Sequence, residues 1–280
     1  MGFGKIFGKS WEEYKSNFKP LFKIMLLFYA IPMIILLIFS TWWFISSGLA
    51  DTLVTTSKSF NITDMSVGNY SFPDTTLFSN SARSSLSPSY FIIYGLLFLV
   101  ILLINFFACF SISAVSLRKE KFTFKEAIGS IDRRYWKSVG FMAVLTIFLS
   151  LLFLALLIPG IIFAVFWIFG YFIFLDEKKG IIFSLKRSFH FVRKKWWKTF
   201  GYILLIILVN IVISIIFGIP AGIFQIYTFF ALLSGKLSIP ILLWGSFIKQ
   251  VFTIAGAFVS LPLTILFFKN FYLARKKERV

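Results

Sequence analysis

Long apolar runs alternate with short basic segments along most of the chain. About 20 apolar residues are needed to cross the ~30 Å hydrocarbon core of a bilayer as a helix. Runs near or above this length predict six membrane-spanning helices, at Leu21–Ser46, Tyr90–Leu117, Gly140–Ile158, Ile161–Leu175, Phe200–Phe217 and about Trp244–Phe268. The pattern therefore predicts an all-α integral membrane protein with a single polytopic domain over residues 1–280.

Proline and glycine mark the expected breaks in these runs. Pro32 predicts a kink in the first span, and Pro159-Gly160 predicts a tight turn between the third and fourth spans. The sequence Gly218-Ile219-Pro220-Ala221-Gly222 is expected to end the fifth span. The short apolar segment Ile223–Leu233 then favours a re-entrant or interfacial piece, although a spanning path for residues 219–245 stays open.

The basic residues gather in four segments, which the positive-inside rule assigns to the cytoplasm. Residues 1–23, 118–137, 176–198 and 269–279 hold 25 of the 29 Lys and Arg residues. Only an arrangement of six spans with both termini inside puts all four on one side. The Ser- and Thr-rich loop 47–89 is then external. Chance is the commoner reason for the Asn-X-Ser/Thr patterns in that loop, at Asn61 and Asn69, and glycosylation is the other.

Three of the basic segments also repeat apolar residues every three or four positions, as an amphipathic helix does. The apolar stripes are Phe3, Phe7, Trp11, Tyr14, Phe18 and Phe22 in 1–22; Phe124, Ile128, Ile131, Tyr135 and Val139 in 122–139; and Ile182, Leu185, Phe189, Val192 and Trp196 in 181–198. Each segment directly precedes a span, which predicts three cytoplasmic-side interfacial helices. Interfacial helix, span, turn and span would form a threefold internal repeat, with units of roughly 1–117, 122–175 and 181–280.

The net charge of +18 could indicate binding to nucleic acid or to an anionic membrane surface, and the composition distinguishes the two. The chain is 59% hydrophobic and only 14% charged, whereas about a quarter of the residues in soluble domains are charged. In such a chain a basic balance favours an anionic membrane surface over nucleic acid. The candidate lipid-contacting residues lie where basic segments meet spans: Arg133, Arg134, Lys137, Arg193, Lys194, Lys195, Trp196, Trp197 and Lys198. The alternative is that these segments are cytoplasmic anchors without lipid recognition.

The residues that catalysis or metal binding requires are sparse. His190 is the single histidine and Cys109 the single cysteine, and no nucleophile or metal-ligand motif contains them. We therefore predict no enzyme activity, no metal and no cofactor. The few polar residues of the spans favour helix–helix hydrogen bonds over proton or ion transport. They are Asn105, Asn210 and Gln225, with Lys249 and Gln250 expected near an interface.

Residues 127–204 resemble a known family. They contain Leu157-Ile158-Pro159-Gly160-Ile161-Ile162, an aromatic-rich helix that ends Leu175-Asp176-Glu177, then Ser184-Leu185-Lys186-Arg187-Ser188 and Trp196-Trp197-Lys198-Thr199-Phe200-Gly201. This pattern is similar to the bacterial and archaeal membrane family typified by YciC and by the membrane domain that accompanies some glycerophosphoryl diester phosphodiesterases. The phosphodiesterase catalytic domain is missing here, so the resemblance implies no such activity and supplies no catalytic residues. Phe166 and Trp167 also stand where members often carry a polar or basic residue.

Together these patterns predict a multi-pass protein of the plasma or inner membrane with both termini in the cytoplasm. The expected role is structural, lipid-associated or concerned with envelope homeostasis, and the expected partners are membrane lipids with anionic headgroups. A homo-oligomer or a membrane protein partner stays open. The alternative function is a transporter or channel for a hydrophobic or amphipathic solute, which a cavity lined by Asn105, Asn210 or Gln225 would favour.

Overall fold

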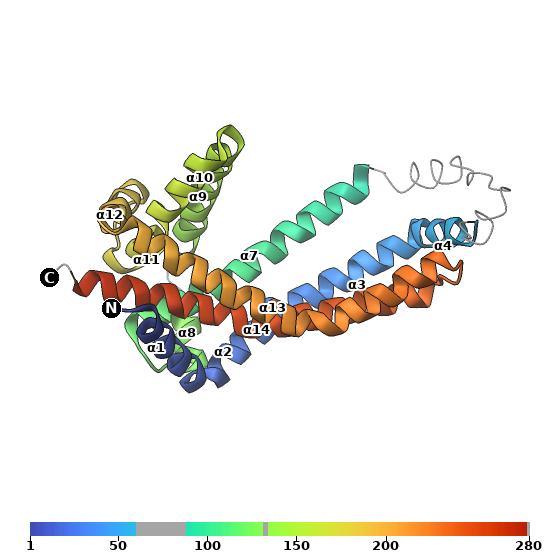
Figure 1. Cartoon of the computed structure of the whole chain (residues 1–280), viewed down its shortest axis with the longest axis horizontal. Helices are drawn as coiled ribbons and strands as arrows, with labels where there is room; N and C mark the ends of the chain where they lie inside the picture. Colours follow the sequence, from blue (N-terminus) through green and yellow to red (C-terminus); the bar gives the residue numbers. More distant parts are fainter. Residues whose placement is uncertain (60–87, 131–133, 279–280) are drawn as a thin grey trace. The chain divides into compact units, whose positions relative to one another are not determined.

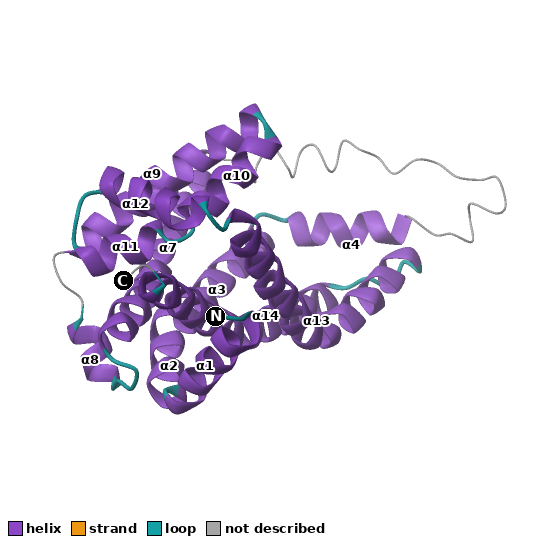
Figure 2. Ribbon diagram, turned by 60° about the vertical axis from the view of Figure 1, so that its left-hand side comes forward, coloured by secondary structure: helices purple, strands orange, loops and turns teal. Residues whose placement is uncertain are grey.

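The computed structural model describes residues 1–59, 88–130 and 134–278, and helices account for nearly all of them. No strand occurs in these ranges, as Figure 2 shows. Six helical stretches are long and apolar enough to cross a membrane: Phe18–Ser46, Phe91–Arg118, Arg134–Ala155, Leu157–Glu177, Trp196–Leu233 and Ile239–Lys277. The predicted fold class, an all-α membrane protein with six spans, is confirmed.

Within each of the described ranges, the helices follow one another with short connections (Figure 1). In chain order they are α1 (Phe3–Ser16), α2 (Phe18–Met25), the π-helix η1 (Leu26–Ala30), α3 (Ile31–Ser46), α4 (Leu49–Ser59), α7 (Pro88–Arg118), α8 (Phe124–Gly129), α9 (Arg134–Ala155), α10 (Leu157–Trp167), α11 (Gly170–Glu177), α12 (Ile181–Arg193), α13 (Trp196–Leu233) and α14 (Ile239–Lys277). The external loop predicted at 47–89 thus begins with the helix α4. Asn61 and Asn69 lie outside the described residues.

Contacts within the chain define two compact units. Unit 1 comprises Met1–Phe28, Leu103–Ile213 and Phe258–Val280, and unit 2 comprises Tyr29–Leu102 and Ser214–Ala257. These boundaries differ from those of the three predicted repeats, and the threefold repeat stays a prediction.

The core of unit 1 is largely aromatic. Phe169, Ile173, Phe267 and Tyr272 are fully buried in it, together with Ile6 from α1. The ring of Phe169 lies edge-on to that of Phe271, with 5.0 Å between the centroids. The C-terminal turns of α14, which the sequence groups with a basic tail, therefore pack in the centre of this unit.

The turn between α9 and α10 lies at Leu156, three residues before the predicted one. Leu156 has extended backbone angles, φ −157° and ψ 122°. Pro159 and Gly160 belong to the first turn of α10, so the prediction that they form the turn itself is wrong. A proline is tolerated there because the first amide groups of a helix have no intrahelical partner.

Gly160 allows α10 to approach α9 closely. A Cβ atom at this position would lie 2.6 Å from Cδ1 of Phe153, whereas one at Gly140 in α9 would meet nothing within 4 Å. We expect Gly160→Ala to cost about 1–3 kcal/mol through overpacking. Gly140→Ala should instead stabilise the protein by up to about 1 kcal/mol, because alanine favours a helix. Thermal unfolding in detergent measures both, and shifts of the same sign would contradict this packing.

α13 continues through the break predicted at residues 218–222. Pro220 lies inside the helix, and Ile223–Leu233 forms its last turns, so the predicted helix end and a separate re-entrant segment are wrong. An interfacial position of residues 223–233 stays a prediction. An apolar solvent leaves backbone groups no partner outside the helix, so losing one hydrogen bond at proline costs less than ending the helix there. The helix ends instead before Gly235, where φ is +65°.

The prediction that each amphipathic stripe forms one continuous helix is also wrong. α8 ends at Gly129 and α9 begins at Arg134, so residues 122–139 are not one helix. The stripe over 1–22 is interrupted at Asn17, between α1 and α2. The stripe over 181–198 is divided where α12 ends at Arg193. At Asn17 and at Lys194-Lys195 a short polar connection interrupts the helix while the apolar spacing continues through it.

The kink predicted at Pro32 takes the form of a wider helical turn. The π-helix η1 directly precedes α3, and Pro32 lies in the first turn of α3. Proline lacks an amide hydrogen and its ring clashes with the carbonyl four residues earlier, here that of Phe28. A π-turn relieves that clash by widening the helix locally.

Candidate functional site

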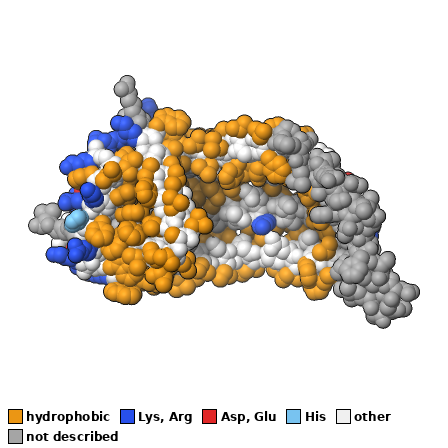
Figure 3. All heavy atoms as spheres, turned by 90° about the horizontal axis from the view of Figure 1, so that it is seen from above, with side chains coloured by type: hydrophobic (Ala, Val, Ile, Leu, Met, Phe, Trp, Pro, Cys, Tyr) orange, Lys and Arg blue, Asp and Glu red, His pale blue; other side chains and the backbone are white. Residues whose placement is uncertain are grey.

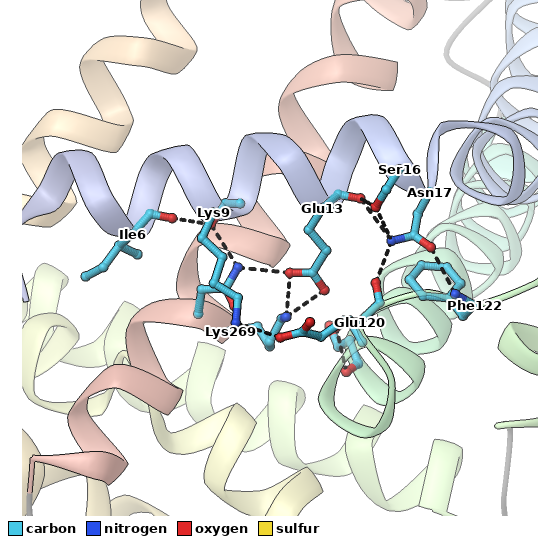
Figure 4. A network of polar contacts seen from close by, with 12 residues as sticks. Ile6, Lys9, Glu13, Ser16, Asn17, Glu120, Phe122 and Lys269 are labelled. Carbon is cyan, nitrogen blue, oxygen red and sulfur yellow. Dashed lines mark hydrogen bonds and ion pairs between the residues drawn. The ribbon is translucent and has the colours of Figure 1, made fainter.

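A buried ion pair joins α1 to α14 inside unit 1. Lys269 Nζ lies 2.6 Å from both carboxylate oxygens of Glu13, as Figure 4 shows. The two side chains are only 1% and 4% exposed. Asn270 adds to the pair by donating from Nδ2 to Glu13 Oε2 at 3.0 Å and to Ser10 Oγ at 3.1 Å. The Glu13 carboxylate is therefore held by three hydrogen bonds from the neighbouring helix.

Asn17 fixes the break between α1 and α2 to the segment that follows α7. Its Nδ2 donates to the carbonyl of Glu13 at 2.9 Å and to that of Glu120 at 2.7 Å. Its Oδ1 accepts from the amide of Phe122 at 2.9 Å. One buried side chain thus satisfies backbone groups of two segments that lie about a hundred residues apart in the sequence.

The last turns of α14 reach two further elements of unit 1. Tyr272 Oη and Lys276 Nζ both donate to Asp176 Oδ2 at the end of α11, at 2.7 and 2.6 Å. Arg275 donates from Nη2 to Thr199 Oγ1 in α13 at 3.2 Å. The cations of this segment hold helices together, so they are not simply a solvated tail.

α12 packs against the joint between α10 and α11 through small polar residues. Ser188 Oγ donates to the carbonyl of Phe166 at 2.7 Å and accepts from the amide of Phe169 at 3.2 Å. Ser184 and Ser188 are fully buried, whereas Ile182 of the predicted apolar stripe is 71% exposed. The protein-facing side of α12 is therefore offset from the stripe, and part of that stripe is left uncovered.

Some of the predicted lipid-contacting residues are engaged within the protein. Arg134 donates from Nη2 to the carbonyl of Lys178 at 3.0 Å, at the C-terminal end of α11. Lys195 pairs with Glu278 at 2.8 Å. Trp196 is half-buried and stacks on Phe200, with 5.1 Å between the ring centroids. Arg133 lies outside the described residues.

The other predicted cations remain available at the surface. Lys137, Arg193, Lys194 and Lys198 are exposed. No carboxylate of the described ranges comes within 4.0 Å of them. Trp136 is 68% exposed at the start of α9 and Trp197 is 79% exposed at the start of α13. We call these six residues the Trp–Lys rim. Lys and Arg side chains also gather next to hydrophobic ones in the space-filling view (Figure 3).

The polar residues of the spans have different surroundings. Asn210 Nδ2 donates to Thr264 Oγ1 at 3.0 Å, which confirms the expected hydrogen bond between helices. Gln225 and Lys249 line a cavity in unit 2. Asn105 is half-buried on α7. His190 is exposed and its Nδ1 contacts the carbonyl of Lys186 at 2.7 Å, as expected for the polar side of α12.

Sequence reasoning missed the pair of Glu13 and Lys269. Two signals point to it. A second stripe with helical spacing runs through Ile6, Ser10, Glu13 and Asn17, and Lys269-Asn270 interrupts the apolar run Ile265–Ala274. A charge inside an apolar run needs a partner, and the second stripe supplies the acid. The described residues contain no cluster that could hold a metal ion, that is, no group of three or more His, Cys, Asp or Glu residues.

Glu126 provides a pH-dependent contact at the start of α8. Its carboxylate completes a capping box with Thr123 and pairs with Lys119. The hydrogen bond from Lys119, and then those from Thr123, lower the pKa of Glu126 from 4.5 to about 2. Because the folded pKa is depressed, the contribution to stability is present above about pH 4.5 and is lost as the pH falls through about 2.

Besides Glu278, whose pKa is likewise lowered to about 2, we expect a carboxyl titration of ¹³C-glutamate-labelled protein to show a pKa near 2 for Glu126. Lys119→Met should raise this pKa, because it removes the largest cause of the shift. Lys125→Met is the matched control, since Lys125 lies on the same helix and makes no ion pair with Glu126. A pKa of Glu126 near 4.3, the usual value for glutamate, would contradict the capping geometry.

Fold and surface together define a polytopic α-helical membrane protein with a polar network at the end of α14. Residues 127–274 match the family described as a domain of unknown function, DUF7847. This match covers more than half of the chain, which therefore belongs to the DUF7847 family. No match was found among curated proteins or among solved structures. The resemblance to YciC and to phosphodiesterase-associated membrane domains stays a prediction.

Proposed function

We propose that this protein is a non-enzymatic, lipid-associated component of the cell membrane, with a structural or envelope-homeostasis role. The Trp–Lys rim carries the proposal, because it combines exposed cations that have no carboxylate partner among the described residues with exposed tryptophans at the starts of two spans. Tryptophan favours the headgroup depth of a bilayer. Each Lys or Arg close to an anionic surface contributes about 1 kcal/mol to attraction. Anionic phospholipid headgroups are the ligands that suit this combination.

The proposed orientation puts both termini and all four basic segments in the cytoplasm. The positive-inside rule supports it, because adding or removing one span would place a basic cluster outside. In this orientation α12 lies at the cytoplasmic interface. Its exposed residues include Ile182 and Phe183 beside Lys186, which is the composition of a helix that rests on a lipid surface.

Lipid selectivity of the full-length protein tests the proposal. The protein is reconstituted in nanodiscs, and the fraction of motionally restricted spin-labelled lipid is compared for phosphatidylglycerol and phosphatidylcholine. We expect a several-fold preference for the anionic lipid that falls as salt is raised, because exposed charges are screened. A variant with glutamine at Lys137, Arg193, Lys194 and Lys198 should lose most of the preference. Equal restriction of both lipids by the wild-type protein would exclude the proposed headgroup binding.

A transporter or channel for an amphipathic solute is the second candidate. One observation favours it, namely that Gln225 lines a cavity in unit 2. Counterflow of a labelled amphiphile in proteoliposomes would test this function, and a flux equal to that of empty liposomes would exclude it for that solute.

A further inference from the structure

Unit 2 contains a cavity between α4, α13 and α14 that has a polar and an apolar part. Its volume is ≈ 430 Å³, within the range of roughly 300–1,000 Å³ that small-molecule sites occupy. Gln225, Thr228, Ser246 and Lys249 supply the polar part, and leucines such as Leu53 and Leu232 supply the apolar part.

Close packing of the hairpin fixes the shape of this cavity. A Cβ atom at Gly245 would lie 3.2 Å from the ring of Phe224 and 3.5 Å from Thr228 Oγ1, so α13 and α14 nearly touch there. Small residues at such contacts let membrane helices approach one another. Gln225, Ser246 and Lys249 are exposed beside this packed contact, so they line an open groove along the helix pair.

Lys249 lies in α14, within a stretch that is long and apolar enough to cross a membrane. α14 begins at Ile239, ten residues earlier, which places Lys249 about 15 Å along the helix. No carboxylate within the described parts of the chain lies within 4.0 Å of its ammonium group. A charged residue within a span is costly and is by default a pointer to function.

The hydrogen-bonding groups of the cavity favour an acidic ligand. Thr228 Oγ1 donates to the carbonyl of Phe224 at 2.9 Å, and Ser246 Oγ donates to that of Leu242 at 3.0 Å. Both hydroxyl hydrogens are thus used within their own helices. The donors left for a ligand are the ammonium group of Lys249 and the amide of Gln225, and both suit a carboxylate.

We propose that this cavity binds a single-chain amphiphile with a carboxylate headgroup, of the fatty-acid class. The carboxylate pairs with Lys249 and accepts from Gln225, and the alkyl chain lies against the leucines. Such a ligand supplies the counter-charge that the described residues do not. This site is independent of the Trp–Lys rim, which lies in unit 1, and it requires no transport step.

The experiment uses the purified full-length protein in a nonionic detergent. A photoreactive C16 fatty acid is cross-linked in competition with increasing palmitate or with hexadecanol, which differs only in the headgroup. We expect palmitate to compete at least tenfold better than hexadecanol, with cross-links in α13 and α14 near Gln225 and Lys249. This comparison needs no variant, so it does not depend on the folding of a mutant.

Two variants test whether the ammonium group of Lys249 binds the carboxylate of the ligand. Lys249→Gln should reduce the affinity for palmitate at least tenfold while leaving hexadecanol unchanged. Lys236→Gln is the matched control, because Lys236 is an exposed cation of the same unit that does not line the cavity. Equal competition by palmitate and hexadecanol, or equal losses in the two variants, would overturn the proposal. Glutamine substitutions in the Trp–Lys rim should leave palmitate binding intact, which separates this site from the headgroup binding proposed for unit 1.

Discussion

Replacing Glu13 with glutamine is expected to destabilise the protein by about 3–5 kcal/mol. The substitution leaves the ammonium group of Lys269 buried without a counter-charge, and breaking a buried ion pair from one side typically costs this much. The side chain of Lys269 is only 1% exposed, so water cannot replace the carboxylate without local opening. Equilibrium unfolding in mixed micelles, followed by tryptophan fluorescence, measures the change.

Two controls separate the ion pair from the general effect of altering α1. Glu12→Gln changes the neighbouring, exposed carboxylate and should shift the unfolding free energy by no more than about 0.5 kcal/mol. Adding Lys269→Met to Glu13→Leu should recover most of the loss, because an apolar pair of similar volume replaces a buried ion pair at little cost. An effect of Glu13→Gln no larger than that of Glu12→Gln would show that the pair does not hold α1 to α14.

A peptide of residues 181–198 should bind anionic vesicles at least a hundredfold more tightly than neutral ones. The segment carries six Lys and Arg residues. At about 1 kcal/mol each, their attraction to an anionic surface sums to roughly 6 kcal/mol before screening, equivalent to about four orders of magnitude in affinity. Vesicle sedimentation with phosphatidylcholine alone and with added phosphatidylglycerol measures the ratio.

The control for this peptide is a scrambled sequence of the same composition, with Ile182, Phe189 and Trp196 moved off one side of the helix. It keeps the charge but loses the apolar stripe, so it should bind anionic vesicles more weakly and show less helicity when bound. Equal retention of the native peptide on neutral and anionic vesicles would show that charge does not drive its binding. Equal binding of the native and scrambled peptides would show that binding does not require an amphipathic helix.

The six spans could be predicted because the bilayer imposes a length on apolar runs. Their ends were less predictable, because tertiary contacts and the apolar solvent decide them. Pro220 is an example, since an isolated helix breaks at proline while α13 continues through it. Pro159-Gly160 is another, since the pair marks the right region but Leu156 supplies the turn.

The polar network was the part that periodicity could not reveal. Glu13 and Lys269 are 256 residues apart in the sequence, and no local pattern records that they meet. The same holds for Asn210 and Thr264, whose hydrogen bond depends on two helices packing side by side. Exposed residues such as Trp197 were easier to identify, because the headgroup region favours particular residue types wherever a span begins.

The membrane topology of the chain tests the central claim most directly. A reporter that is active only outside the cytoplasm is fused after residue 70, 125, 190 or 280, with a cytoplasm-active reporter as the complement at each position. Six spans with both basic termini inside predict that the fusion at residue 70 is external and that those at residues 125, 190 and 280 are cytoplasmic. A fusion at residue 125, 190 or 280 that reports from outside, or one at residue 70 that reports from inside, would contradict the account.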